Sequence, residues 1–167
     1  GIACAMAMGC STNAIVHLIA MSRRAGHAVT LDDFDAASRS VPVIANIRPS
    51  GDTYLMEDFF YAGGLPALLK RIEGHLKTGA LSVNGKTLGE NIAGAEVYND
   101  DVIRPLANPI YAEGALAVLR GIEDALADQA AVGARHSRLL LVFPAGDHQP
   151  RRDLQLAQHV ALLVGVG

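Results

Sequence analysis

The stretch GCSTNAIVHLIA, residues 9–20, determines how the first part of the chain folds. Its glycine and cysteine are followed by Ser11, Thr12 and Asn13, whose side-chain oxygens are suited to accept hydrogen bonds from the free N–H groups at a helix start. Apolar residues then recur at positions i, i+3 and i+4, which places them on one face of a helix. The stretch therefore predicts a helix over residues 12–24.

The start of this helix is a candidate binding site. A helix that begins at Thr12 directs free N–H groups and a partial positive charge toward the residues before it, and such a start can bind a carboxylate or a phosphate. The other interpretation is a well-capped, buried helix without a ligand, which residue types alone favour because caps are common and anion sites are few. We expect His17 to be a hydrogen-bonded histidine of the core rather than a catalytic one.

The composition excludes several classes of protein. The 167 residues include 50% hydrophobic and 19% charged residues, which excludes wholesale disorder. A net charge of −3 gives no basic patch, so we expect no nucleic-acid partner. Cys4 and Cys10 are the two cysteines, too few for a disulfide framework or for a self-contained zinc or iron–sulfur site. We expect both to be buried free thiols.

The first 22 residues carry no charge, which raises the question of a membrane segment. A signal peptide needs a basic start, and a spanning helix tolerates poorly a polar cluster such as Ser11, Thr12, Asn13 and His17. We therefore expect no membrane partner. The uncharged run is better explained if the chain is an interior piece of a longer cytoplasmic enzyme.

Local patterns predict further elements along the chain. Glycines, prolines, capping boxes and β-branched runs mark their ends and types. We expect helices over residues 1–8, 31–38, 55–61 and 66–76, the last with Leu65, Leu68, Leu69, Ile72 and Leu76 on one face. We also expect a strand over 41–47, a turn at 48–51, extended chain over 97–110, and a hairpin at Asn84-Gly85 that competes with a helix start at Thr87–Glu90.

Many segments, in order, carry a resemblance to a known family. They are MGCSTNAIVHL (8–18), LDDFD (31–35), SRSVPV (38–43), PSG (49–51), YLMEDF (54–59), AGG (62–64), GKTLGEN (85–91), DVIRPL (101–106), NPIY (108–111) and ALAVLRG (115–121). The chain thus resembles the dihydroxy-acid and sugar-acid dehydratases over roughly residues 1–121. Cys10 in place of a glycine, together with the DVIRPL run, looks more like the sugar-acid branch, as in arabinonate and xylonate dehydratases.

The resemblance implies a chemistry and its cofactors. In this family a [2Fe–2S] cluster acts as the Lewis acid, Mg²⁺ holds the substrate, and a serine of the C-terminal domain acts as the base. The cluster cysteines, the magnesium carboxylates and a modified lysine lie before the matched part, and the base serine lies after it. We therefore assign no catalytic residue and no metal ligand to this chain, and none to Cys4 or Cys10.

Substrate-side roles remain for the matched part. Ser11, Thr12 and Asn13 are the candidates for substrate binding, through the helix start. Glu57 and Asp58 are adjacent carboxylates that would suit magnesium, but neighbours on a helix point in different directions, so we expect one of them to act at a helix N-terminus. Arg104 is a candidate for a salt bridge across the module boundary, and Lys86 is expected to be solvated.

The end of the chain gives conflicting signals. Residues 115–131 are rich in Ala, Leu, Glu and Asp, which favours a helix, whereas the family has a strand at the segment matching residues 114–120. We find no family match over residues 122–167, where 139–143 would suit a buried strand and 154–164 a helix. Our hypothesis is a frame change or recombination near Gly121.

These observations give one interpretation of fold and domains. We expect a mixed α/β fold, with residues 1–108 as the helix-rich end of the N-terminal α/β domain and 109–121 as the start of a β-rich C-terminal domain, reached by a crossover. Residues 122–167 are expected to be a divergent tail.

The interpretation of function follows. The parent enzyme is expected to be a hydro-lyase that converts a sugar acid or 2,3-dihydroxy acid to a 2-keto-3-deoxy acid and, by the resemblance, a homo-oligomer. The isolated chain is expected to be inactive. The alternative is a non-catalytic helical interaction module that uses the apolar face of residues 1–22.

Overall fold

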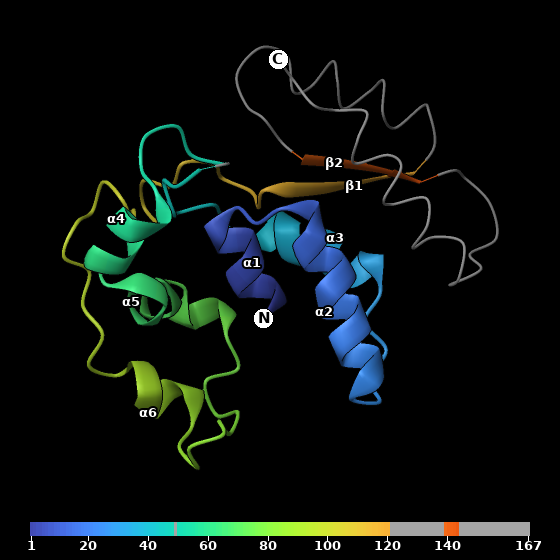
Figure 1. Cartoon of the computed structure of the whole chain (residues 1–167), viewed down its shortest axis with the longest axis horizontal. Coiled ribbons are helices and arrows are strands. Elements are labelled where there is room, and N and C mark those ends of the chain that lie inside the picture. The colour runs from blue at the N-terminus through green and yellow to red at the C-terminus, as the bar shows by residue number, and fades with distance from the viewer. Residues whose placement is uncertain (49, 121–138, 144–167) are drawn as a thin grey trace. The chain divides into compact units, whose positions relative to one another are not determined.

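The computed structural model describes residues 1–48, 50–120 and 139–143. Most of the regular structure in these residues is helical (Figure 1). The helices are α1 (Ile2–Met8), α2 (Thr12–Arg24), α3 (Leu31–Ser40), α4 (Met56–Tyr61), α5 (Gly64–Arg71), the 3₁₀ turn η1 (Glu73–His75) and α6 (Leu88–Ile92), and the strands are β1 (Leu116–Arg120) and β2 (Leu139–Phe143). No helix among the described residues is both long and apolar enough to span a membrane.

The chain divides into two compact units. Unit 1 comprises residues 1–10 and 37–115, and unit 2 comprises residues 11–36 and the chain from Leu116 onward, of which 116–120 and 139–143 are described.

An extended segment, residues 41–47, runs through the core of unit 1. Val43, Ile44 and Ala45 are fully buried in it. Its backbone exchanges hydrogen bonds with the end of α1, with residues 102–104 and with residues 110–111. The predicted strand is therefore wrong as a sheet strand, although the chain is extended: the segment makes isolated bridges at Val43, Ala45 and Ile47. Residues 103, 111 and 54 each form one isolated bridge with it, so no ladder builds up.

Helix α1 ends at Gly9, as the sequence predicts. Gly9 has φ +73°, a left-handed conformation that suits glycine at a helix end. The Ser50 hydroxyl donates a 2.7 Å hydrogen bond to the Gly9 carbonyl, and a Cβ on Gly9 would lie only 2.3 Å from Cβ of Ser50. Two requirements, the backbone conformation and the close approach of Ser50, thus demand glycine here.

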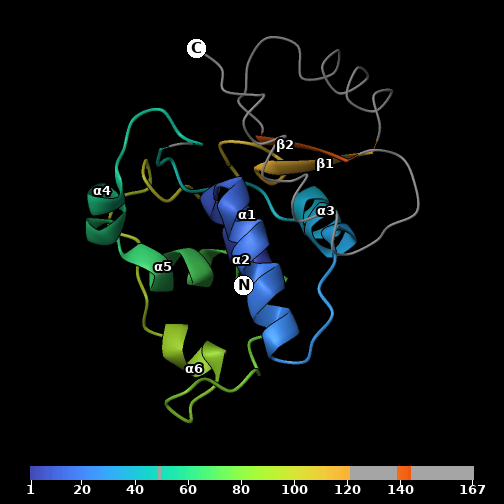
Figure 2. The same ribbon diagram turned by 45° about the vertical axis from the view of Figure 1, so that its right-hand side comes forward.

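Unit 1 also contains α4, α5 and α6, and α5 contacts α1, α4 and α6 (Figures 1 and 2). The predicted single helix over 66–76 is wrong in extent, because α5 ends at Arg71 and the 3₁₀ turn η1 follows. Gly74, in η1, disfavours continuation of the helix. Leu65 is 45% exposed rather than buried with Leu68 and Ile72.

The two competing signals at residues 81–90 are both satisfied. Leu81 and Thr87 form an antiparallel bridge around a turn in which Gly85 has φ +79°, and α6 starts directly afterwards. The Thr87 hydroxyl accepts from the Glu90 N–H at 3.1 Å, and a Glu90 carboxylate oxygen accepts from the Thr87 N–H at 2.7 Å. The hairpin and the capping box coexist because each strand is reduced to one residue.

Unit 2 contains α2 over the predicted residues, with Ile15 and Ile19 buried. Helix α3 begins in this unit with the predicted Thr30–Asp33 pair, in which the Thr30 N–H donates to the Asp33 carboxylate at 2.8 Å. It ends at Ser40, two residues later than the sequence predicts. Phe34 is buried and 1% exposed.

Strands β1 and β2 pair in parallel, with Leu116 opposite Leu139 and Arg120 opposite Phe143. The helix favoured by composition is therefore wrong over 116–120, and the strand implied by the resemblance is confirmed. The strand predicted at 139–143 is also confirmed. The rest of the favoured helix and the helix predicted over 154–164 lie outside the described residues. The helical part of the expected mixed α/β fold is thus confirmed. The sheet of the described residues is limited to this one short parallel pair, so the mixed class itself is not confirmed.

Cys4 and Cys10 are both free, as expected, but each is half-buried rather than fully buried. Burial raises the pKa of the Cys4 thiol and is the main reason that the pKa of Cys10 rises from 9.0 to about 11. A hydrogen bond from the backbone opposes this rise at Cys10, and the neighbouring Cys4 adds to it. Both thiols are therefore protonated at neutral pH.

Gly63→Ala is expected to destabilise unit 1 by about 2 kcal/mol or more. Gly63 has φ +117°, and an added Cβ would lie 2.3 Å from the Glu96 carbonyl oxygen and 2.6 Å from Cβ of Ala67. The matched control is Gly74→Ala, where a Cβ meets nothing within 4 Å, so its effect should stay within about 0.5 kcal/mol. Urea unfolding followed by far-UV circular dichroism measures both, and equal stabilities of the two variants would contradict the model of strain at Gly63.

Alkylation of Cys10 by iodoacetamide is expected to keep accelerating as the pH rises through 9 toward a midpoint near 11. At pH 8 the raised pKa lowers the thiolate fraction about a hundredfold, and the greater nucleophilicity of a more basic thiolate recovers about tenfold, so the net rate falls about tenfold. Mass spectrometry of a Cys4→Ser variant over pH 7–11 isolates Cys10. A midpoint near the unshifted value of 9.0 would show that burial does not control this thiol.

Candidate functional site

Ser11 occupies the N-cap position of α2, with φ −78° and ψ 163°. Its side chain makes no capping hydrogen bond, so the predicted cap is confirmed in position but wrong in its contact. Within the described part of the chain, the N–H groups of Thr12 and Asn13 also have no hydrogen-bond acceptor. Ser11 and Asn13 are exposed and Thr12 is half-buried. The helix start therefore presents free donors and small polar side chains to solvent.

The charges along α2 favour an anion at this end. The first turn contains no acidic residue, and Arg23 and Arg24 occupy the last turn. The arginines interact favourably with the negative end of the helix dipole, while no carboxylate of the helix offsets the positive end. A carboxylate or phosphate is the ligand that fits such a start.

His17 is exposed, so the expectation of a core histidine is wrong. It lies four residues after Asn13, and residues with this spacing share one face of a helix. Met21 continues that face and is 60% exposed. With Ile15 and Ile19 buried, Asn13, His17 and Met21 form the exposed face of α2.

The carboxylates of α4 do not converge on a metal site. Asp58 accepts a 2.8 Å hydrogen bond from the Leu55 N–H, which confirms the expected role at a helix N-terminus, and Glu57 is exposed. Across residues 1–48, 50–120 and 139–143, no group of three or more His, Cys, Asp or Glu residues could hold a metal ion.

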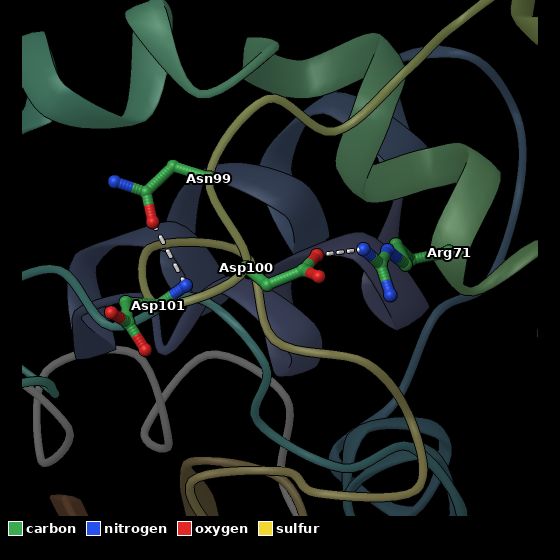
Figure 3. A network of polar contacts seen from close by, with 4 residues as sticks. All are labelled: Arg71, Asn99, Asp100 and Asp101. Atoms are coloured by element: carbon green, nitrogen blue, oxygen red, sulfur yellow. Dashed lines mark hydrogen bonds and ion pairs between the residues drawn. The ribbon is translucent and has the colours of Figure 1, made fainter.

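Arg104 has its Nε buried, without a hydrogen-bond partner among the described residues, and no ion pair of Arg104 is seen there. The expected salt bridge of Arg104 is therefore not found. The long-range ion pair that sequence reasoning missed joins Arg71 at the end of α5 to Asp100 (Figure 3). In the same loop, Asn99 accepts a 2.9 Å hydrogen bond from the Asp101 N–H. Lys86 is exposed, as expected.

A cavity in unit 1 was not predicted either. It has a volume of about 280 Å³ and is lined by Tyr54, Asp58, Tyr61, Ala62, Tyr98, Asn99 and Val102, and we call it the tyrosine pocket. A 3.0 Å hydrogen bond from the Tyr98 N–H to the Ala62 carbonyl joins the two segments that form it. The three tyrosines come from two loops and a helix, so they follow no sequence period. The sequence signal for the pocket is therefore weak: two tyrosines within residues 54–61, and a third at position 98.

Comparison with known proteins identifies the family. The family described as dihydroxy-acid/6-phosphogluconate dehydratase N-terminal matches residues 1–91. The chain is 50% identical over 124 residues to 6-deoxy-6-sulfo-D-gluconate dehydratase of Pseudomonas putida, covering 72% of this chain and 21% of the relative. It is 47% identical over 117 residues to L-arabinonate dehydratase of Rhizobium leguminosarum bv. trifolii, covering 69% and 20%.

A third relative belongs to the branch named for dihydroxy acids. The mitochondrial dihydroxy-acid dehydratase of Schizosaccharomyces pombe is 48% identical over 120 residues, covering 70% of this chain and 20% of the relative. The chain thus spans about a fifth of the length of these relatives. All three are named dehydratases, which are lyases. By its match over more than half of its length, the chain belongs to the dihydroxy-acid/6-phosphogluconate dehydratase family, in the N-terminal part of that family's sequence.

Proposed function

We propose that this chain is part of a hydro-lyase that removes water from a sugar acid, or from a 2,3-dihydroxy acid, to give a 2-keto-3-deoxy acid or the corresponding keto acid. The names of the Pseudomonas and Rhizobium relatives, which specify sugar acids, support the first substrate class. Cys10 and the DVIRPL run also favour the sugar-acid branch.

The observation that carries a role for this chain is the open start of α2. Every substrate of this class carries a carboxylate, and removal of the neighbouring proton adds negative charge to it. Free N–H groups at Thr12 and Asn13, with the hydroxyl of Ser11, are donors that stabilise such charge. In the proposal, Ser11, Thr12 and Asn13 therefore bind and orient the substrate carboxylate.

The [2Fe–2S] cluster and Mg²⁺ belong to this proposal for the parent enzyme only. When bound, the cluster would supply Lewis-acid chemistry and the magnesium ion would hold the acid. The described residues do not fit either group: the chain has two cysteines, fewer than the four thiolates that usually hold a [2Fe–2S] cluster, and the described residues contain no cluster of three metal-binding side chains. We therefore derive no step through them.

The resemblance to the dehydratase family supports the remaining proposals for the parent enzyme. They are a cytoplasmic location, a homo-oligomeric assembly, and a division at residues 1–108, 109–121 and 122–167 within a mixed α/β architecture.

The rival function, an interaction module using the apolar face of residues 1–22, has less support. In this segment Ala5, Met6 and Ala7 of α1 are buried, as are Ile15 and Ile19 of α2. Met21 is the large apolar side chain of residues 1–22 that is strongly exposed. The apolar face is thus used within the fold.

A chimera tests the proposed function directly. The matching segment of the Rhizobium L-arabinonate dehydratase is replaced by residues 1–120 of this chain, and we expect dehydration of L-arabinonate with kcat/KM within about tenfold of the parent. The isolated 167-residue chain should show no turnover. Turnover by the isolated chain, or a folded chimera without activity, would contradict the proposal.

Within the chimera, Ser11→Ala and Asn13→Ala are expected to lower kcat/KM by about 10- to 100-fold, since a hydrogen bond to a charged group contributes about 1.5–3 kcal/mol. The matched control is Met21→Ala, which changes an exposed side chain at the other end of α2 and should leave kcat/KM unchanged. Equal effects of all three substitutions would remove the role of the helix start without removing the family's reaction.

A further inference from the structure

We propose that the tyrosine pocket of unit 1 binds an organic cation, specifically an ammonium group that carries methyl groups. This proposal is independent of the proposed dehydratase function.

The first support is the aromatic lining. Three tyrosines are among the residues that line an open pocket of about 280 Å³, just below the range of about 300–1,000 Å³ that is usual for ligand pockets. Tyr61 is 68% exposed and Tyr98 is 73% exposed, so their rings are accessible to a ligand. The face of an aromatic ring is electron-rich and attracts a cation placed over it, and several rings around one cavity form the kind of cage that selects quaternary ammonium groups.

The second support is the charge of the two segments that form the pocket. Residues 51–62 contain Asp52, Glu57 and Asp58, residues 98–103 contain Asp100 and Asp101, and neither segment contains a lysine or an arginine. Arg71 pairs with Asp100, and in Figure 3 Asp100 points toward Arg71 while Asn99 and Asp101 point away from it. Four of these five carboxylates remain beyond that ion pair, and Arg48, whose Nε donates a 3.3 Å hydrogen bond to the Asp52 carbonyl, adds one positive charge next to them. The segments thus keep a net negative charge, which favours a cation over an anion.

The third support is the carboxylate in the lining itself. One oxygen of Asp58 accepts the hydrogen bond from Leu55, and the other has no hydrogen-bond partner among the described residues. Asp58 is a lining residue of the tyrosine pocket, so its carboxylate can offset the charge of a bound cation. A methylated ammonium ion is less strongly hydrated than the ammonium of lysine. It therefore loses less hydration free energy when it enters an aromatic site.

The ligand class follows from these three observations taken together. An anionic sugar acid would face the Asp58 carboxylate without a basic residue in either lining segment. A neutral apolar ligand would gain from the rings but not from the carboxylates. A methylated ammonium ion uses both.

The test compares three probes on the full 167-residue chain by NMR titration: choline, its uncharged isostere 3,3-dimethyl-1-butanol, and the anion L-arabinonate. We expect choline to shift the tyrosine ring resonances with a Kd about tenfold lower than that of the isostere, and L-arabinonate to cause no shift. The proposal would be overturned by equal affinities for choline and the isostere, or by stronger binding of the anion. It would also be overturned if 100 mM choline, a concentration on the order of ten times a weak millimolar Kd, caused no shift.

Variants assign the binding to the pocket. Tyr98→Leu should weaken choline binding about fivefold, whereas Tyr98→Phe, which keeps the ring face, should stay within about twofold. Asp58→Asn removes the charge but keeps an oxygen that can accept from Leu55, and it should weaken choline more than the isostere. The control is Leu81→Ala, because Leu81 is 79% exposed and does not line the pocket, whereas the exposed Phe60 packs edge-on against Tyr61 of the lining. A loss in Leu81→Ala equal to that in Tyr98→Leu would show nonspecific binding to exposed apolar side chains and overturn the assignment.

Discussion

The hydrogen bonds of the extended segment 41–47 are the constraint on which unit 1 depends. The segment is almost entirely buried, so each of its backbone donors and acceptors must find a partner inside the protein. Ile44 and Ala45 donate to the Ala7 carbonyl, Asn46 donates to Val102, and Val43 exchanges bonds with residues 110–111. A buried backbone group left without a partner costs about 1–3 kcal/mol. The end of α1 and two distant loops are therefore held against one strand-like segment.

Two regions of the molecule have opposite electrostatic character. The start of α2 has no acidic residue in its first turn and presents free N–H groups, which favours an anion. The segments around the tyrosine pocket carry acidic residues and no basic ones, which favours a cation. Neither preference arises from the net charge of −3, because both depend on where a few charged groups lie relative to helix ends and aromatic rings. Local arrangement, rather than composition, decides what each region can bind.

The sequence predicted best those elements whose signals are local. Gly9, the Thr30–Asp33 pair and the Thr87–Glu90 capping box each act within a few residues, and the structure confirms all three. It predicted less well what depends on distant partners. The segment 41–47 has the composition of a strand but meets irregular loops, and residues 116–120 favour a helix by composition but pair with β2. The tyrosine pocket and the Arg71–Asp100 pair join segments far apart in the chain, which no local pattern encodes. The strand at 116–120 was predicted from the resemblance, because the family's known fold already includes the effect of distant strand partners on this segment.

The long separations within unit 1 have a consequence for how it folds. Tyr111 donates a hydrogen bond to the Ser50 carbonyl across 61 residues, and the bridges from Val43 to Tyr111 and from Ala45 to Ile103 span similar distances along the chain. To form such a contact the chain must first close a large loop, which costs conformational entropy before the contact contributes any stability, and this slows folding. During synthesis on the ribosome, α1 and the segment 41–47 leave the exit tunnel well before residues 103–111. Until those residues arrive, a row of apolar β-branched side chains and unpaired backbone groups is open to other chains, and this interval is when a nascent unit 1 most needs a chaperone.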